Sequence, residues 1–147
     1  MVENLKILFR RDLEKLREEI AAYKNEANIW RIENSISNSA GNLCLHLVGN
    51  LNCYIGAEIG KTGYVRNREL EFSLKNIPKE ELLEKIDATI KVVTDALNTL
   101  KDEDLDSEYP LLVLKEKTST GYFLMHLAVH LGYHLGQVNY HRRLLDQ

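Results

Sequence analysis

The chain has 147 residues, of which 44% are hydrophobic and 28% charged, and its net charge is −3. These values are typical of a globular protein of one domain, so we expect a single domain over residues 1–147. A slightly acidic chain without a block of lysine and arginine disfavours a nucleic-acid partner. No apolar run approaches the roughly 18 residues of a membrane span, which disfavours a membrane protein.

Cysteine usage and the first residues bear on the compartment. Cys44 and Cys53 lie in one apolar segment that reads as a single helix. A helix separates two such positions by roughly 13 Å, which is too far for a disulfide. Charged residues such as Glu3 and Lys6 among the first apolar ones exclude a signal peptide. We therefore expect a reduced, cytoplasmic protein.

Apolar residues recur every three or four positions in four segments, and this spacing predicts four helices. In chain order they span residues 3–26, 38–60, 78–100 and about 120–145. Asn34, Ser35 and Ser37 are candidate N-caps of the second helix, and Thr118, Ser119 and Thr120 of the fourth. Pro78 suits the first turn of the third, and Gly60 and Gly63 suit the end of the second. The pattern predicts an all-α four-helix bundle.

The connectors between the helices are long. Residues 61–77 form a polar loop with Arg66, Arg68 and Glu71, and a loop of this length often has a function or covers another element. Residues 101–118 form an acidic connector in which Leu111–Leu114 could be extended. Because these connectors are long, a simple up-down order of short loops does not follow from the sequence.

Four of the five histidines lie in one quadrant of the last helix, at residues 126, 130, 134 and 141. Two histidines four positions apart project from the same face and can share one metal ion, whereas three on successive turns cannot easily all reach it. A third ligand must then come from another helix, where His46 is the only histidine. The alternative is that His46 is a core histidine that hydrogen bonds satisfy.

Polar neighbours would complete such a site. Asn42, Asn50 and Gln137 are predicted hydrogen-bond partners of the ligands, and His126 is either another partner or an entrance residue. We expect His141 to be a surface or helix-end residue that the helix dipole stabilises. Cys53 lies on a face similar to that of His46, but a buried cysteine is usually a small hydrophobe.

Several familiar motifs are absent. The stretch GAEIGKT at residues 56–62 has three residues between its glycines, whereas a phosphate-binding loop needs four and follows a strand. No Glu-x-x-His pair suggests a di-iron centre, and no His-Glu-x-x-His motif suggests a zinc protease.

The chain resembles the DinB/YfiT-like superfamily of bacterial helical bundles. The resemblance rests on HLAVHLGYHLGQVNYHRRLL (126–145), NSISNSAGNLCLHLVGNLNCYIG (34–56) and RNRELEF (66–72). It implies an up-up-down-down four-helix bundle, often dimeric, and a metal site of one histidine on the second helix and two on the fourth. These correspond to His46, His130 and His134, with zinc or nickel as the metal. Some members are thiol S-transferases or thiol-dependent isomerases.

Three imidazole ligands would leave a coordination position open, which is typical of a catalytic site. The ion would lower the pKa of a bound thiol or water and so produce a nucleophile. The predicted partners are a low-molecular-weight thiol, whose carboxylates Arg66, Arg68 or Tyr133 could hold, and a small electrophile. The alternative function is a non-catalytic dimeric bundle that acts as a binding or stress-response protein.

Overall fold

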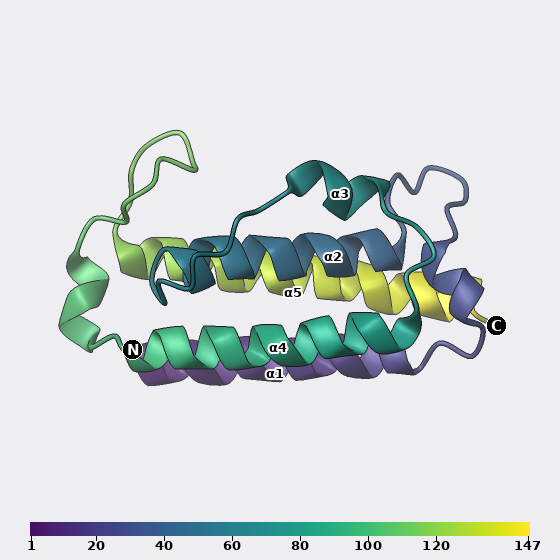
Figure 1. Cartoon of the computed structure of the whole chain (residues 1–147), viewed down its shortest axis with the longest axis horizontal. Coiled ribbons are helices and arrows are strands. Elements are labelled where there is room, and N and C mark those ends of the chain that lie inside the picture. The colour runs from purple at the N-terminus through teal and green to yellow at the C-terminus, as the bar shows by residue number, and fades with distance from the viewer.

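Leucine, isoleucine and phenylalanine side chains at three- and four-residue steps give each long helix an apolar face, and these faces meet in one core. The computed structural model describes residues 1–147, and the long helices are α1 (Val2–Ala21), α2 (Ala40–Leu51), α4 (Lys79–Asn98) and α5 (Thr120–Leu145) (Figure 1). No strand forms, so the prediction of an all-α helical bundle is confirmed. No helix combines the length and the apolar content that crossing a membrane requires.

Short helical segments fill the connectors. They are η1 (Glu26–Trp30), η2 (Asn52–Ala57), α3 (Arg68–Ser73) and η3 (Asp102–Asp106), of which η2 is a π-helical continuation of α2. Helix α1 therefore ends five residues earlier than predicted, and the loop predicted over 61–77 contains a helix. Residues 111–114 form no strand, since the connector has only an isolated bridge between Glu108 and Ser119.

The helix starts follow ordinary capping chemistry. The Ser39 hydroxyl accepts a hydrogen bond from the Asn42 backbone N–H, and the Ser119 hydroxyl accepts one from the backbone of Tyr122. Ser119 was among the predicted caps, whereas the cap of α2 lies beyond the three residues predicted for it. Just after η2, a Cβ on Gly60 would lie 3.0 Å from that of Ala96, so this glycine lets the chain pass close to α4.

Contacts between the helices fix their directions. Helix α1 packs on α4 and α5, and α2 packs on the same two helices. The amino group of Met1 contacts Asp102, just beyond the end of α4, so α1 and α4 are antiparallel. Helices α2 and α4 are parallel, because Asn52 bonds to Thr89 and Gly60 lies at Ala96. Helices α2 and α5 are antiparallel (Figure 1).

The predicted up-up-down-down order is wrong, because the helices run up-down-down-up along the chain (Figure 1). The connector after α1 does not extend back along the bundle. Instead it folds into η1 at the end where α1 stops, and Trp30 packs against Gly41 in the first turn of α2. The next pair, α2 and α4, is parallel, so residues 58–78 must travel back along the bundle, and α3 lies on α2 along that return path (Figure 1).

Candidate metal centre

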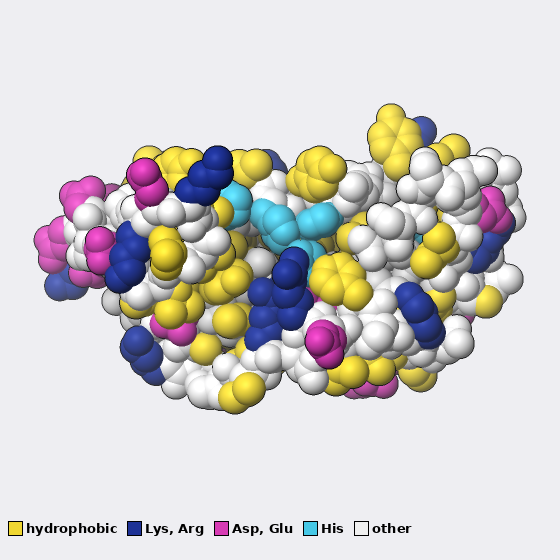
Figure 2. Space-filling view, turned by 90° about the horizontal axis from the view of Figure 1, so that it is seen from above, with side chains coloured by type: hydrophobic (Ala, Val, Ile, Leu, Met, Phe, Trp, Pro, Cys, Tyr) yellow, Lys and Arg dark blue, Asp and Glu magenta, His cyan; other side chains and the backbone are white.

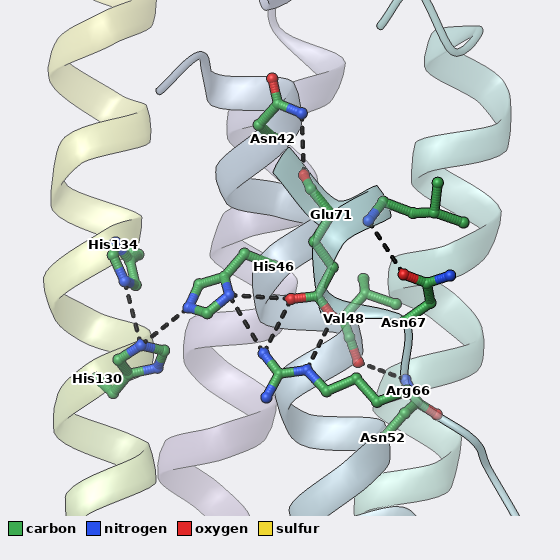
Figure 3. A network of polar contacts seen from close by, with 10 residues as sticks. Asn42, His46, Val48, Asn52, Arg66, Asn67, Glu71, His130 and His134 are labelled. Carbon is green, nitrogen blue, oxygen red and sulfur yellow. Dashed lines mark hydrogen bonds and ion pairs between the residues drawn. The ribbon is translucent and has the colours of Figure 1, made fainter. Parts of the chain in front are cut away.

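The antiparallel pairing of α2 and α5 brings three histidines together midway along the bundle. His46 comes from the middle of α2, and His130 and His134 lie one turn apart on α5 (Figure 3). The Nε2 atom of His130 lies 3.2 Å from that of His46 and 3.1 Å from that of His134. One potential ligand atom from each residue lies within 4.8 Å of the other two. The structure thus brings together the three predicted ligands.

The outer nitrogens of two of these rings face hydrogen-bond acceptors. The Nδ1 atom of His46 lies 3.1 Å from a carboxylate oxygen of Glu71, and that of His134 lies 2.7 Å from the amide oxygen of Gln137. Both acceptors favour a proton on Nδ1, which leaves the lone pair on Nε2. The Nη2 atom of Arg66 also lies 3.3 Å from Nδ1 of His46, but its shorter contact, at 2.9 Å, is with Glu71. The Nε2 lone pairs of His46 and His134 then both point at Nε2 of His130, which has at most one ring proton and can donate it to only one of them. A cation at this point would instead bond to all three nitrogens.

Glu71 is the residue of this site that the sequence did not reveal. It lies on α3, is 6% exposed, and accepts two hydrogen bonds from Arg66, at 2.8 and 2.9 Å (Figure 3). Gly49 makes room for it, because a Cβ there would lie 1.8 Å from a Glu71 oxygen. Asn42 donates to the backbone carbonyl oxygens of Glu71 and Leu74 and so holds α3 on α2. Asn42 therefore supports the site indirectly rather than touching a histidine.

The protonation states suit a cation. Burial, together with the neighbouring histidines, lowers the pKa of His130 to about 4, and burial also lowers the pKa of His134. Both rings are therefore neutral at physiological pH and keep a lone pair for a metal ion. Burial alone would raise the pKa of Glu71, but hydrogen bonds from His46 and Arg66 outweigh it and lower the pKa. Glu71 is thus an anion beside His46, which increases the electron density of the ring.

The spacing of the nitrogens fits a small divalent ion. A tetrahedral zinc ion with Zn–N bonds of about 2.0–2.1 Å holds its ligand atoms about 3.3 Å apart. The two short Nε2 separations, 3.1 and 3.2 Å, lie close to this value. Three imidazoles with a carboxylate and an amide behind them form a donor set common to zinc and related transition metals.

The other predicted site residues lie nearby but in different roles. Asn50 contacts no ring nitrogen, and its buried Oδ1 has no hydrogen-bond partner. His126 lies one turn from His130, with ring centroids 6.4 Å apart. Burial raises the pKa of the Cys53 thiol, which keeps it protonated and does not favour a nucleophile. Tyr133 is 65% exposed and stands beside His134.

His141 was predicted to be a surface or helix-end residue; it lies four residues from the end of α5, but the surface alternative is wrong. It is 4% exposed, its Nδ1 contacts the hydroxyl of Tyr23, and its Nε2 lies 2.9 Å from the carbonyl oxygen of Arg31. The segment after α1 folds back over the end of α5 and covers it, which the spacing along α5 could not indicate.

A cleft of about 280 Å³ opens beside the centre, and His46, His130, Asn50, Arg66, Arg68 and His126 are among its lining residues. In the space-filling view, histidines are visible at the surface midway along the molecule, next to lysine or arginine side chains (Figure 2). The centre is thus reachable from solvent, unlike a structural metal site that its ligands close on every side.

Comparison with known families agrees with this architecture. The family model described as "Protein of unknown function (DUF1572)" matches residues 2–147. The chain belongs to the DUF1572 family. This family is DinB/YfiT-like, in agreement with the resemblance of the histidine-bearing segments. None of the curated proteins matches the chain. Family membership therefore supports the fold, and the functional argument rests on the site.

Proposed function

We propose that this DUF1572 protein binds one divalent metal ion through His46, His130 and His134 and uses it in catalysis. The observation that carries the proposal is the convergence of three Nε2 atoms while acceptors occupy the Nδ1 sides of His46 and His134. Zinc or nickel suits this donor set. The resemblance to the DinB/YfiT-like superfamily supports the same three ligands.

The reaction class that fits best is the transfer of a low-molecular-weight thiol, or of water, to a small electrophile. A bound divalent ion supplies a positive charge that lowers the pKa of a coordinated thiol or water. Three protein ligands leave a position for that group, and the adjacent cleft leaves space for the electrophile. Glu71 holds the Nδ1 proton of His46 and Gln137 that of His134, so both rings keep their lone pairs toward the centre.

The decisive experiment measures the metal content of the purified, untagged protein by elemental analysis. We expect about one equivalent in wild type, or after titration of the chelator-treated protein with zinc or nickel, and none in a His46→Ala/His130→Ala double variant. A matched control is His126→Ala, which removes a histidine of the same helix outside the cluster. Wild type that neither carries nor binds metal would instead favour the non-catalytic bundle. Metal-loaded wild type without thiol-transfer or hydrolytic activity would limit the proposal to metal binding.

We also propose that the protein is a homodimer in the cytoplasm, where its two free cysteines stay reduced. Exposed apolar side chains form a row along the outer face of α5, at Tyr122, Met125, Val129, Tyr133, Tyr140 and Leu144. Such a row is unusual on a monomer and suits the same face of a second copy. Analytical sedimentation tests this proposal: Val129→Glu should sediment as a monomer, whereas Ile7→Glu, at an exposed position of α1, should remain a dimer as wild type does. A wild type that sediments as a monomer contradicts the dimer.

A further inference from the structure

The cleft beside the metal centre contains two buried polar atoms that the chain leaves without partners. The Oδ1 atom of Asn50 and the Nδ1 atom of His130 are both buried and unbonded, and both residues line the cleft. Asn50 is only 6% exposed. In Figure 3, the second ring nitrogen of His130 is turned away from His134 toward the side of Arg66. Buried polar atoms are almost always hydrogen-bonded, so an exception beside a reactive centre indicates a ligand.

The two atoms complement each other. Nδ1 of His130 carries the ring proton when Nε2 faces the metal, so it donates, whereas Oδ1 of Asn50 accepts. A hydroxyl group is a donor and an acceptor at once, so it can satisfy either atom or both. This points to a ligand with a hydroxyl, or a similar small polar group, at the inner end of the cleft.

The charges along the cleft favour an anion. Two nitrogens of Arg66 donate hydrogen bonds to Glu71. Arg68 forms no ion pair, and its guanidinium lies over the ring of Phe72, 5.8 Å from the centroid. None of the residues that line the cleft is acidic. An unpaired guanidinium at a cleft without acidic residues is suited to bind a carboxylate. Of the three side chains that the sequence offered for this role, the structure favours Arg68.

We propose that the cleft binds a small hydroxycarboxylate group, with Arg68 on the carboxylate and Asn50 and His130 Nδ1 on the hydroxyl. The cleft has ample room for such a group, because its volume of about 280 Å³ approaches the roughly 300–1,000 Å³ of clefts that bind drug-sized ligands. The inference deepens the proposed function, since it names the substrate class of the same centre. Arg68 and Asn50 are specificity residues in this scheme.

The test uses lactate and its neutral analogue lactamide as probes, titrated into metal-free and zinc-loaded protein by NMR. We expect wild type to bind lactate at least about tenfold more tightly than lactamide, which is about 1.4 kcal/mol. Arg68→Gln should abolish that preference. Arg143→Gln is the matched control, since Arg143 also forms no ion pair and lies over an aromatic ring, that of Tyr140. Equal affinities for the two probes in wild type, or an unchanged preference in Arg68→Gln, would overturn the proposal.

Asn50 is tested by a different signature. Asn50→Leu removes the unbonded amide and keeps the volume, so it should leave thermal stability unchanged or raised while weakening both probes at least fivefold. Asn50→Ala opens the cleft and should weaken them as well, which excludes blockage by leucine. Unchanged affinities in both variants would exclude Asn50 from the proposal.

The outcomes separate this inference from the metal proposal, because metal content is measured on the same samples. A protein that holds zinc but does not distinguish lactate from lactamide overturns the cleft inference alone. A protein that holds no metal and still prefers lactate overturns the metal proposal alone. The metal-free titration also separates binding at Arg68 from direct coordination of lactate by zinc.

Discussion

Buried or half-buried histidines occur at two places along α5, and they differ in whether the chain provides partners for their ring nitrogens. At the end of the bundle, both ring nitrogens of His141 have partners from the chain, the hydroxyl of Tyr23 and the carbonyl oxygen of Arg31. At mid-bundle, the Nε2 atoms of His46 and His134 both face that of His130, and a ring proton on His130 can pair with only one of them. The first arrangement is complete without a ligand, and the second becomes favourable with a cation.

The comparison shows that burial does not distinguish a structural histidine from a ligand. His141 and His46 are 4% and 6% exposed, and yet one belongs to the core and the other to the candidate centre. What differs is how the chain treats the second ring nitrogen. A histidine whose two nitrogens are both satisfied has no lone pair to offer, whereas one whose Nδ1 alone is held presents Nε2 for coordination.

The largest effect that separates the two regions is expected from His134→Ala. Structural zinc sites release about 10–16 kcal/mol on binding, so one of a few ligands contributes enough to lower affinity by roughly 100- to 1,000-fold when it is lost. Competition with a chelator measures this loss. His126→Ala, on the same helix, should retain wild-type affinity. Equal losses in the two variants would contradict the three-histidine assignment.

The converse change is His141→Ala, which should lower the free energy of unfolding and leave metal affinity unchanged. It leaves the Tyr23 hydroxyl and the Arg31 carbonyl unpaired in the interior, at a cost of about 2–4 kcal/mol in the free energy of unfolding. Urea unfolding of the metal-free protein measures this cost. Ile7→Ala, at an exposed position of α1 outside the proposed dimer face, should change stability by less than about 0.5 kcal/mol. Loss of metal from His141→Ala would show that the two regions are not independent.

A smaller effect is expected from Glu71→Gln, which keeps the shape of the side chain and removes its charge. Loss of the carboxylate behind a metal-bound histidine typically lowers affinity by about 10- to 100-fold. Chelator competition against Glu69→Gln, an exposed neighbour on α3, provides the matched comparison. If both variants bind zinc as wild type does, then Glu71 only helps to hold α3 on α2 and has no effect on the metal.

The smallest effect is a pH dependence in the structural region. Burial lowers the pKa of His141 below its ordinary value of 6.5, although the hydrogen bond to Arg31 partly offsets it. As pH falls through 6.5, the unfolded chain takes up a proton at this residue and the folded chain does not, so the stabilisation by His141 is lost toward acid. The stability gap between wild type and His141→Ala, both metal-free, should therefore narrow from pH 7.5 to 5.5, by at most about 1.4 kcal/mol per pH unit. A gap that widens would reverse the assigned sign.

The sequence predicts what depends on local spacing. The apolar stripes located the four long helices, and the four-residue step between His130 and His134 placed both on one face. Helix directions were not predictable, because they depend on how residues 22–39 fold against the end of the bundle. The role of His141 was hidden for the same reason, since Tyr23 and Arg31 lie more than 100 positions away in the chain.

Glu71 was missed because nothing in its neighbourhood marks it. Glu71 and Glu69 lie two positions apart in the same six-residue helix. Only the packing of α3 on α2 buries the carboxylate of Glu71 and leaves that of Glu69 exposed. Gly49 was the faint signal, as a glycine inside an apolar helix often admits a close neighbour. The spacing of residues within α2 cannot connect Gly49 to Glu71, which lies in the segment 58–78 that joins α2 to α4.

The crossover over residues 58–78 exists because α2 and α4 are parallel neighbours, and a chain must travel back along the bundle to join them. That detour carries Arg66, Arg68 and Glu71, so the residues behind and beside the metal centre belong to a segment outside the bundle core. A substitution at an exposed position of this segment, such as Arg68, can therefore change the surroundings of the candidate centre without disturbing the packing of the bundle core. The candidate ligands and the side chains around them therefore come from two separate parts of the chain, the helices of the bundle and the crossover that joins two of them.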